Sequence, residues 1–263
     1  MTPGEIDAAL CHARIEARFQ PIVRIADRAP VALEALARID DPVHGVIAAE
    51  RFVPQIERAG RADDLTDQVV ASIFADLARG LPAMEGLRVG INLPLDLLLR
   101  PDTLARLEAA REAAGIAAAL IVIELTENQQ VEDAAALGRA LEAYRRAGFG
   151  AAIDDVGPAM RWVDRLLDLP FTGLKLDGAI VALAGEEPAI GDFAAGIVAA
   201  ARRRDMRVTA EGVEDAPAWR QAVALGADQA QGFLIGPVLR AEALAPWRAR
   251  WGATPAVHSC VAT

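Results

Sequence analysis

Lysine is almost missing from this chain. Of its 263 residues, 27 are lysine or arginine, and Lys175 is the only lysine. Arginine keeps its proton and its planar fork, whereas lysine is a compact ammonium whose pKa can move. Lys175 lies in the short apolar segment 173–177, beside Asp177. It belongs either to an ordinary ion pair or to a site that needs such an ammonium.

Cysteines and long apolar runs are scarce as well, and each scarcity excludes a class of protein. Cys11 and Cys260 lie at opposite ends of the chain and match no disulfide or metal-binding pattern. No apolar run is long enough to cross a bilayer, and the N-terminus lacks the basic and apolar regions of a signal peptide. We therefore expect a cytoplasmic protein without membrane insertion.

Positive charge and aromatic rings are also in deficit. The formal net charge is −10, and aromatic residues make up 5% of the chain. A DNA-binding surface needs basic residues to neutralise phosphates, and a platform for single strands needs aromatic rings. We expect no DNA partner. If the ligand is a phosphate ester, a divalent cation must offset the acidic site.

Short apolar segments alternate with longer amphipathic ones along the chain. The apolar spacing of Leu137, Leu141 and Tyr144 places these residues on one face of a helix. The alternation and the chain length predict an α/β fold, a modified (β/α)8 TIM-like barrel. The expected strands are 19–23, 31–36, 87–92, 120–124, 150–154, 173–176, 207–211 and 228–232.

The connection between the first two expected strands is too short for a helix. It consists of residues 26–29, and a parallel crossover needs about a dozen residues, so these strands must pair antiparallel. We expect the barrel to span residues 13–250. Residues 1–12 are expected to form an N-terminal helical extension, and 251–263 a flexible C-terminal tail.

Polar side chains end seven of the expected strands. They are Glu34, Asn92, Glu124, Asp154 with Asp155, Lys175 with Asp177, Glu211 and Gln231. Taken singly, each has a structural explanation as a helix cap or a turn residue. The C-terminal strand ends of such a barrel meet at one mouth, however, and several carboxylates gathered there repel strongly without a cation.

The chemistry of these side chains favours hard divalent cations. Carboxylate and amide oxygens suit Mg²⁺ or Mn²⁺, and no histidine or cysteine ends a strand to favour zinc. The adjacent Asp154 and Asp155 suggest two metals, with Asp154 bridging them. A metal pair about 4 Å apart activates water and stabilises the leaving oxygen at phosphorus. With Lys175 orienting or helping to deprotonate that water, the residues predict metal-dependent phosphoester hydrolysis.

Eight segments, taken in order, resemble the EAL-domain cyclic-di-GMP phosphodiesterase family across roughly residues 13–250. They are Phe19-Gln20-Pro21-Ile22-Val23, Glu34-Ala35-Leu36-Ala37-Arg38, Gly90-Ile91-Asn92-Leu93, Glu124-Leu125-Thr126-Glu127, Ile153-Asp154-Asp155, Leu174-Lys175-Leu176-Asp177, Ala210-Glu211-Gly212-Val213-Glu214 and Gln231-Gly232-Phe233. The resemblance implies a barrel with an antiparallel first strand. It also implies hydrolysis of cyclic di-GMP to linear pGpG in a two-metal site that takes Mg²⁺ or Mn²⁺, with Ca²⁺ inhibitory.

The resemblance also assigns roles to individual residues. The metal ligands are Glu34, Asn92, Glu124, Asp154, Asp155 and Glu211, and the catalytic residues are Lys175 and Glu211. The substrate contacts are Gln20, Leu36, Arg38, Asp67 and Gln231, and the supporting acids are Glu127, Asp177 and Glu214. The alternative for Arg38 is a surface ion pair with Asp40 or Asp41.

One loop departs from the family pattern. Fully active members usually carry Asp-Asp-Phe-Gly-Thr-Gly, whereas here the loop is Asp154-Asp155-Val156-Gly157-Pro158-Ala159. Pro158 fixes φ and Ala159 disfavours a positive φ, so we expect weakened or differently regulated catalysis. The alternatives are a catalytically impaired cyclic-di-GMP receptor, an interaction module without nucleotide affinity, and another barrel enzyme such as a lyase. A homodimer and an upstream sensor protein are the expected partners.

Overall fold

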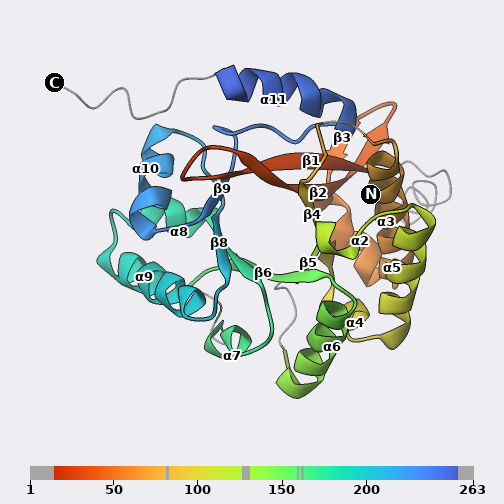
Figure 1. The fold of residues 1–263 in the computed structure, drawn as a ribbon, viewed down its shortest axis with the longest axis horizontal. Coiled ribbons are helices and arrows are strands. Elements are labelled where there is room, and N and C mark those ends of the chain that lie inside the picture. The colour runs from red at the N-terminus through yellow and green to blue at the C-terminus, as the bar shows by residue number, and fades with distance from the viewer. Residues whose placement is uncertain (1–14, 81–82, 126–130, 159, 161–162, 254–263) are drawn as a thin grey trace.

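The computed structural model describes residues 15–80, 83–125, 131–158, 160 and 163–253. Within them, eight strands close into a ring and a ninth lies outside it (Figure 1). The order is β1-β9-β8-β7-β6-β5-β4-β2-β3, and β1 also pairs with β2, which closes the barrel. The strands are β1 (Ile15–Arg24), β2 (Pro30–Asp41), β3 (Gly45–Ala48), β4 (Arg88–Leu93), β5 (Ile121–Leu125), β6 (Gly150–Val156), β7 (Gly173–Leu176), β8 (Arg207–Ala210) and β9 (Gln229–Gln231).

The first strand runs against both of its neighbours. β1 pairs antiparallel with β2 and with β9, while the remaining neighbours in the ring are parallel. The expected barrel with an antiparallel first strand is confirmed. The expected end of the second strand at Glu34 is wrong, because β2 continues to Asp41 and pairs there with β3. Glu34 therefore lies in the middle of a strand.

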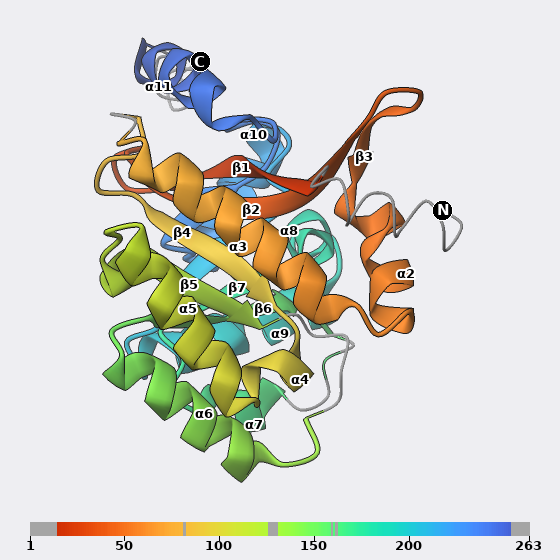
Figure 2. The same ribbon diagram turned by 90° about the vertical axis from the view of Figure 1, so that its right-hand side faces the viewer.

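Helices surround the barrel (Figures 1 and 2). The α-helices are α2 (Val53–Arg58), α3 (Ala62–Ala78), α4 (Leu95–Leu98), α5 (Pro101–Ala113), α6 (Ala134–Arg146), α7 (Val163–Leu167), α8 (Gly178–Leu183), α9 (Pro188–Arg202), α10 (Ala216–Leu225) and α11 (Leu244–Ala253). Three short 3₁₀ turns are η1 (Ala49–Arg51), η2 (Ala118–Leu120) and η3 (Ala241–Ala243). The predicted helix face of Leu137, Leu141 and Tyr144 is buried in α6. No helix of the described segments is long and apolar enough to cross a membrane.

A small second core supports the extension of β2. Ile39 of β2 and Ile47 of β3 pack with Phe52, Ile56 and Leu65 in a cluster apart from the main core. Figure 2 shows β3 and α2 to one side of the barrel, next to the beginning of α3. This cluster holds α2 and the first turns of α3 in place beside the site described below.

The C-terminal helix packs on the hairpin between β1 and β2. Trp251 stacks on Trp247 with ring centroids 6.4 Å apart, and it donates from Nε1 to the carbonyl of Arg28 at 2.8 Å. Helix α11 thus continues to Ala253, inside the segment expected to be a tail. The rest of that segment, like the expected N-terminal extension, lies outside the described residues.

Candidate active site

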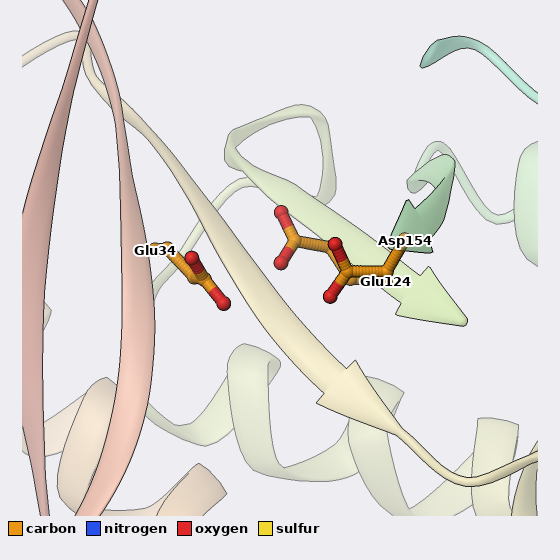
Figure 3. Close-up of side chains that lie close together, drawn as sticks. All are labelled: Glu34, Glu124 and Asp154. Atoms are coloured by element: carbon orange, nitrogen blue, oxygen red, sulfur yellow. The ribbon is translucent and has the colours of Figure 1, made fainter. Parts of the chain in front are cut away.

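Inward-pointing side chains form a polar layer at the C-terminal end of the barrel. Alternate residues of a strand face the interior, so inward side chains from different strands meet there. The register of the strands supports such a polar layer, since Asn92 of β4 lies opposite Glu124 of β5, and Gln20 of β1 lies opposite Glu34 of β2. Figure 3 shows the carboxylates of Glu34, Glu124 and Asp154 facing one space between the strands. All three side chains are buried.

The carboxylates form two overlapping groups. Oxygens of Glu34, Glu124 and Asp154 lie within 4.8 Å of one another, and so do oxygens of Asp154, Asp155 and Glu211. Asp154 belongs to both groups, which is the geometry that two cations sharing one bridging ligand require. Asn92 donates from Nδ2 to Glu34 Oε1 at 3.2 Å, which leaves its carbonyl oxygen as the ligand atom it can offer.

A bulge brings both aspartates to the site. Adjacent residues of a regular strand point to opposite faces. The pairing of β6 with β7 shifts between Ile153 and Val156, and Asp155 has a φ of 49°. Its amide donates to Asp154 Oδ1 at 3.0 Å. Aspartate tolerates this left-handed conformation better than most residues, so the bulge aims both carboxylates at one place.

Lys175 lies at the centre of the carboxylates. Its Nζ is 2.7 Å from Glu211 Oε1, 2.9 Å from Asp154 Oδ1, 3.1 Å from Glu34 Oε2 and 3.4 Å from Glu124 Oε2. Asp177 instead caps α8 by accepting from the amide of Ala179. Burial opposes the charged ammonium, but the four carboxylates outweigh it and raise the pKa of Lys175 well above its usual value. The lysine is therefore a permanent donor here.

The carboxylates carry more charge than one ammonium can offset. Burial raises the pKa of Glu124 to about 8 and that of Asp154 to about 6, against the opposing effect of Lys175. The pKa of Glu211 is also raised by burial. For Glu34 burial acts in the same direction, but Lys175, Gln231 and Asn92 outweigh it and lower the pKa. Five oxygen ligands with excess negative charge fit hard divalent cations.

Metal binding at these carboxylates should release protons. Asp154 and Glu124 hold protons below about pH 6 and pH 8 respectively, and a cation must displace them. As the pH rises from 6 to 8, we expect the dissociation constant of Mn²⁺ to fall about tenfold per pH unit for each proton that the metal displaces. Calorimetry in buffers of different ionisation enthalpy measures this. Asp67→Asn, which changes an exposed carboxylate, should follow the wild-type curve, and an affinity independent of pH would contradict the assignment.

Glycines make room for the acidic side chains. A Cβ on Gly90 would lie 2.1 Å from Glu124 Oε1, so the glutamate occupies space that any other residue at position 90 would fill. Gly212 has a φ of 60°, and a Cβ there would lie 2.7 Å from the Cα of Gly178. The loops after β7 and β8 thus touch through their backbones, and this contact fixes the position of Glu211.

A pocket of about 600 Å³ opens above the carboxylates. Gln20, Leu36, Arg38 and Gln231, expected to contact substrate, all line it, and so does Glu214. Within the described residues Arg38 is buried and makes no ion pair, and it donates to the carbonyl of Ala37 at 2.8 Å. The carboxylate of Asp40 lies instead beside Arg18 and Arg240. The alternative prediction for Arg38, a surface ion pair, is therefore not met by Asp40.

Gln231 links the pocket floor to the carboxylates. Its Nε2 donates to Gln20 Oε1 at 3.1 Å and to Glu34 Oε2 at 2.5 Å. Its Oε1 is buried and has no hydrogen-bond partner among the described residues. Since buried acceptors are normally satisfied, this atom can receive a hydrogen bond from a water or a ligand in the site.

One of the expected residues lies elsewhere. Asp67 is an exposed residue of α3 that pairs with Arg106 at 3.4 Å, and it does not line the pocket. Glu127 lies outside the described residues. The pocket also has lining residues that sequence reasoning did not single out: Val53, Pro54, Glu57, Thr66, Val69 and Phe233. Most come from α2 and α3. The placement of these helices beside the pocket depends on the second core, and no local sequence motif indicates that placement.

Comparison with known proteins identifies the family. The EAL domain matches residues 4–238. Cyclic di-GMP phosphodiesterase NbdA of Pseudomonas aeruginosa is 32% identical over 80% of this chain and 27% of its own length. Cyclic di-GMP phosphodiesterase PA2567 of the same species is 28% identical over 88% of this chain and 40% of its own length. The chain thus spans less than half the length of these curated relatives.

A solved structure shows the same fold. PaMucR phosphodiesterase, in a c-di-GMP complex, superimposes with a TM-score of 0.84 at 25% identity, over 92% of this chain and 98% of that one. The FimX EAL domain from Pseudomonas aeruginosa bound to c-di-GMP, at 19% identity and a TM-score of 0.79, shares the fold. The two carboxylate groups, the ring with its antiparallel β1 and the match over most of the chain lead to one conclusion: this chain belongs to the EAL-domain, cyclic di-GMP phosphodiesterase family.

Proposed function

We propose that this chain hydrolyses cyclic di-GMP to linear pGpG with Mg²⁺ or Mn²⁺. The observation that carries the proposal is the pair of three-carboxylate groups sharing Asp154 at the floor of a large pocket. The activity named for NbdA and PA2567 supports it. So does the bound ligand named for the PaMucR structure.

The pocket suits a cyclic dinucleotide. Its volume of about 600 Å³ lies in the usual range for small-molecule sites. Arg38 offers a planar fork to a phosphate. Phe233 is 65% exposed and lines the pocket, so its ring face is open to a purine base. Val53 and Val69 add apolar surface on the side of α2 and α3.

The chain's own residues supply positioning and proton transfer. Two divalent cations held by the carboxylates would supply the charge that activates water and stabilises the leaving oxygen at phosphorus. Lys175 lies between Glu211 and Asp154 and, as a fully protonated ammonium, orients the water by donating to it. Glu211, whose pKa is raised by burial, is the group placed to take the proton on a carboxylate oxygen.

Turnover tests the proposal directly. Purified protein with Mg²⁺ or Mn²⁺ should convert cyclic di-GMP to pGpG, as separated by chromatography, while Ca²⁺ should support binding without hydrolysis. Intact dinucleotide after incubation with metal-replete protein that binds it would select the receptor. Failure to bind it even with Ca²⁺ would select an interaction module. Self-association and an upstream sensor partner stay predictions.

The divergent loop favours the receptor as the second candidate. Val156 is fully buried, so a phenylalanine there would overpack the core, whereas Pro158 is exposed and replaceable. We expect Pro158→Thr combined with Ala159→Gly to raise kcat several-fold and leave KM unchanged, because Pro158 does not line the pocket. Steady-state kinetics with Mn²⁺ measures this. An unchanged kcat would show that these two positions do not limit catalysis.

A further inference from the structure

A second cavity lies inside the barrel, below the carboxylates. Its volume is about 50 Å³. Of the described residues, Lys175 alone lines both this lower cavity and the pocket above, so the lysine separates the two spaces. Glu124 borders the lower cavity only. The two cavities are therefore distinct places for a ligand.

The lower cavity exists because the next interior layer is made of small residues. Barrels of this kind are normally filled by branched side chains. Here Ala32, Gly90, Ala152 and Gly173 line the space instead. Because a water needs only about 10–15 Å³ of such space, the cavity holds several waters or one small polyatomic ion, but no nucleoside.

Two arginines close the N-terminal end of this cavity. Arg88 begins β4 and Arg207 begins β8, and both line the cavity. The sheet order separates β4 from β8 by three strands on either side, so the two residues stand on opposite walls of the ring. Neither makes an ion pair or a side-chain hydrogen bond with a described residue. Burial and the charge of Arg207 both lower the pKa of Arg88.

Neutral polar groups complete the lining. Thr209 donates its hydroxyl to Gln229 Oε1 at 3.2 Å, and both side chains are buried. The Nε2 group of Gln229 then remains as a donor, since it gives no hydrogen bond to any residue in the described segments. The one carboxylate of the lining, Glu124, lies near the C-terminal end of β5 beside Lys175, whereas the two arginines begin their strands at the other end. Two cations and a free amide donor at that end define a site for negative charge.

We propose that the lower cavity binds a small tetrahedral oxyanion, inorganic phosphate or sulfate, between the guanidinium groups of Arg88 and Arg207. The anion offsets the two positive charges that line the cavity and accepts from Gln229. Arg38 in the upper pocket can also bind a phosphate group, so the test must distinguish the upper pocket from the lower cavity.

Titration of the metal-free protein with inorganic phosphate tests the proposal. Calorimetry at constant ionic strength should give saturable binding of one phosphate per chain. Arg207 is exposed, so Arg207→Gln should leave the core intact, and it should weaken phosphate binding about tenfold or more because it removes a charge-assisted contact. Arg207→Lys, which keeps the charge and loses the fork, should weaken it less.

Two control variants locate the anion. Arg38→Gln removes the arginine of the upper pocket, and Arg220→Gln removes an exposed arginine of α10, and both should bind phosphate as wild type does. Binding that is lost in Arg38→Gln but kept in Arg207→Gln would place the anion in the upper pocket and overturn the proposal. Absence of saturable binding in the wild type would overturn it as well.

Discussion

Glu34→Gln is expected to lower the turnover of cyclic di-GMP by about a thousandfold while the protein stays folded. Glu34 is one of three carboxylates in the first group, and its oxygens receive hydrogen bonds from Asn92 and Gln231. Its pKa is lowered, whereas those of Glu124 and Asp154 are raised. Glu34 thus stays ionised to lower pH than Glu124 and Asp154 before a cation arrives, and its charge cannot be replaced by theirs.

The control for this variant is a second glutamate of the same pocket. Glu50 lines the pocket but is exposed and belongs to neither carboxylate group. Glu50→Gln should retain turnover within about threefold, because a single exposed charge contributes little. The assay is release of pGpG with saturating Mn²⁺. If Glu34→Gln kept wild-type turnover with full metal occupancy, the first carboxylate group would not be a catalytic metal site.

Gly90→Ala should reduce turnover about a hundredfold through one added methyl group. The Cβ would lie 2.1 Å from Oε1 and 2.5 Å from Cδ of Glu124, so the glutamate must move. A shift of about 1 Å in a positioned group can cost about a hundredfold in rate. The Mn²⁺ affinity should fall together with the rate, as calorimetry and kinetics on one preparation would show.

Two further variants isolate this effect. A methyl group added at Gly196 in α9 would meet no atom within 4 Å, so Gly196→Ala should keep full activity and gain up to about 1 kcal/mol of stability. Combining Gly90→Ala with Glu124→Asp shortens the displaced side chain and should restore part of the metal affinity. Wild-type activity of Gly90→Ala would mean that Glu124 does not hold its position during catalysis.

Much of the site follows from the sequence because parallel strands end at one rim. Asn92, Glu124, Asp154 and Lys175 were predicted to meet there, and the structure brings them together. The periodicity of apolar residues and the length of the first connection were also sufficient to predict the closed ring and its antiparallel first strand. These features depend on local patterns and on general rules of strand pairing.

What could not be predicted depends on contacts between distant segments. The extension of β2 to Asp41 is supported by β3 and by the second core, and neither leaves a motif near Glu34. The inward aim of Asp155 depends on a bulge against β7. The pairing of Asp67 with Arg106 of α5 is not visible in the sequence either, because a helix presents several faces and the sequence does not show which one meets α5.

The ring closes between segments from the two ends of the chain. Ile22 of β1 pairs with Gln231 of β9, and the hydrogen bonds from Gln231 to Gln20 and Glu34 span 211 and 197 positions. Contacts of such long range form late in folding, since the entropy of closing the loop must first be overcome. A chain emerging from the ribosome therefore closes the ring, and gives Glu34 its hydrogen bond from Gln231, only once its last strand has been synthesised.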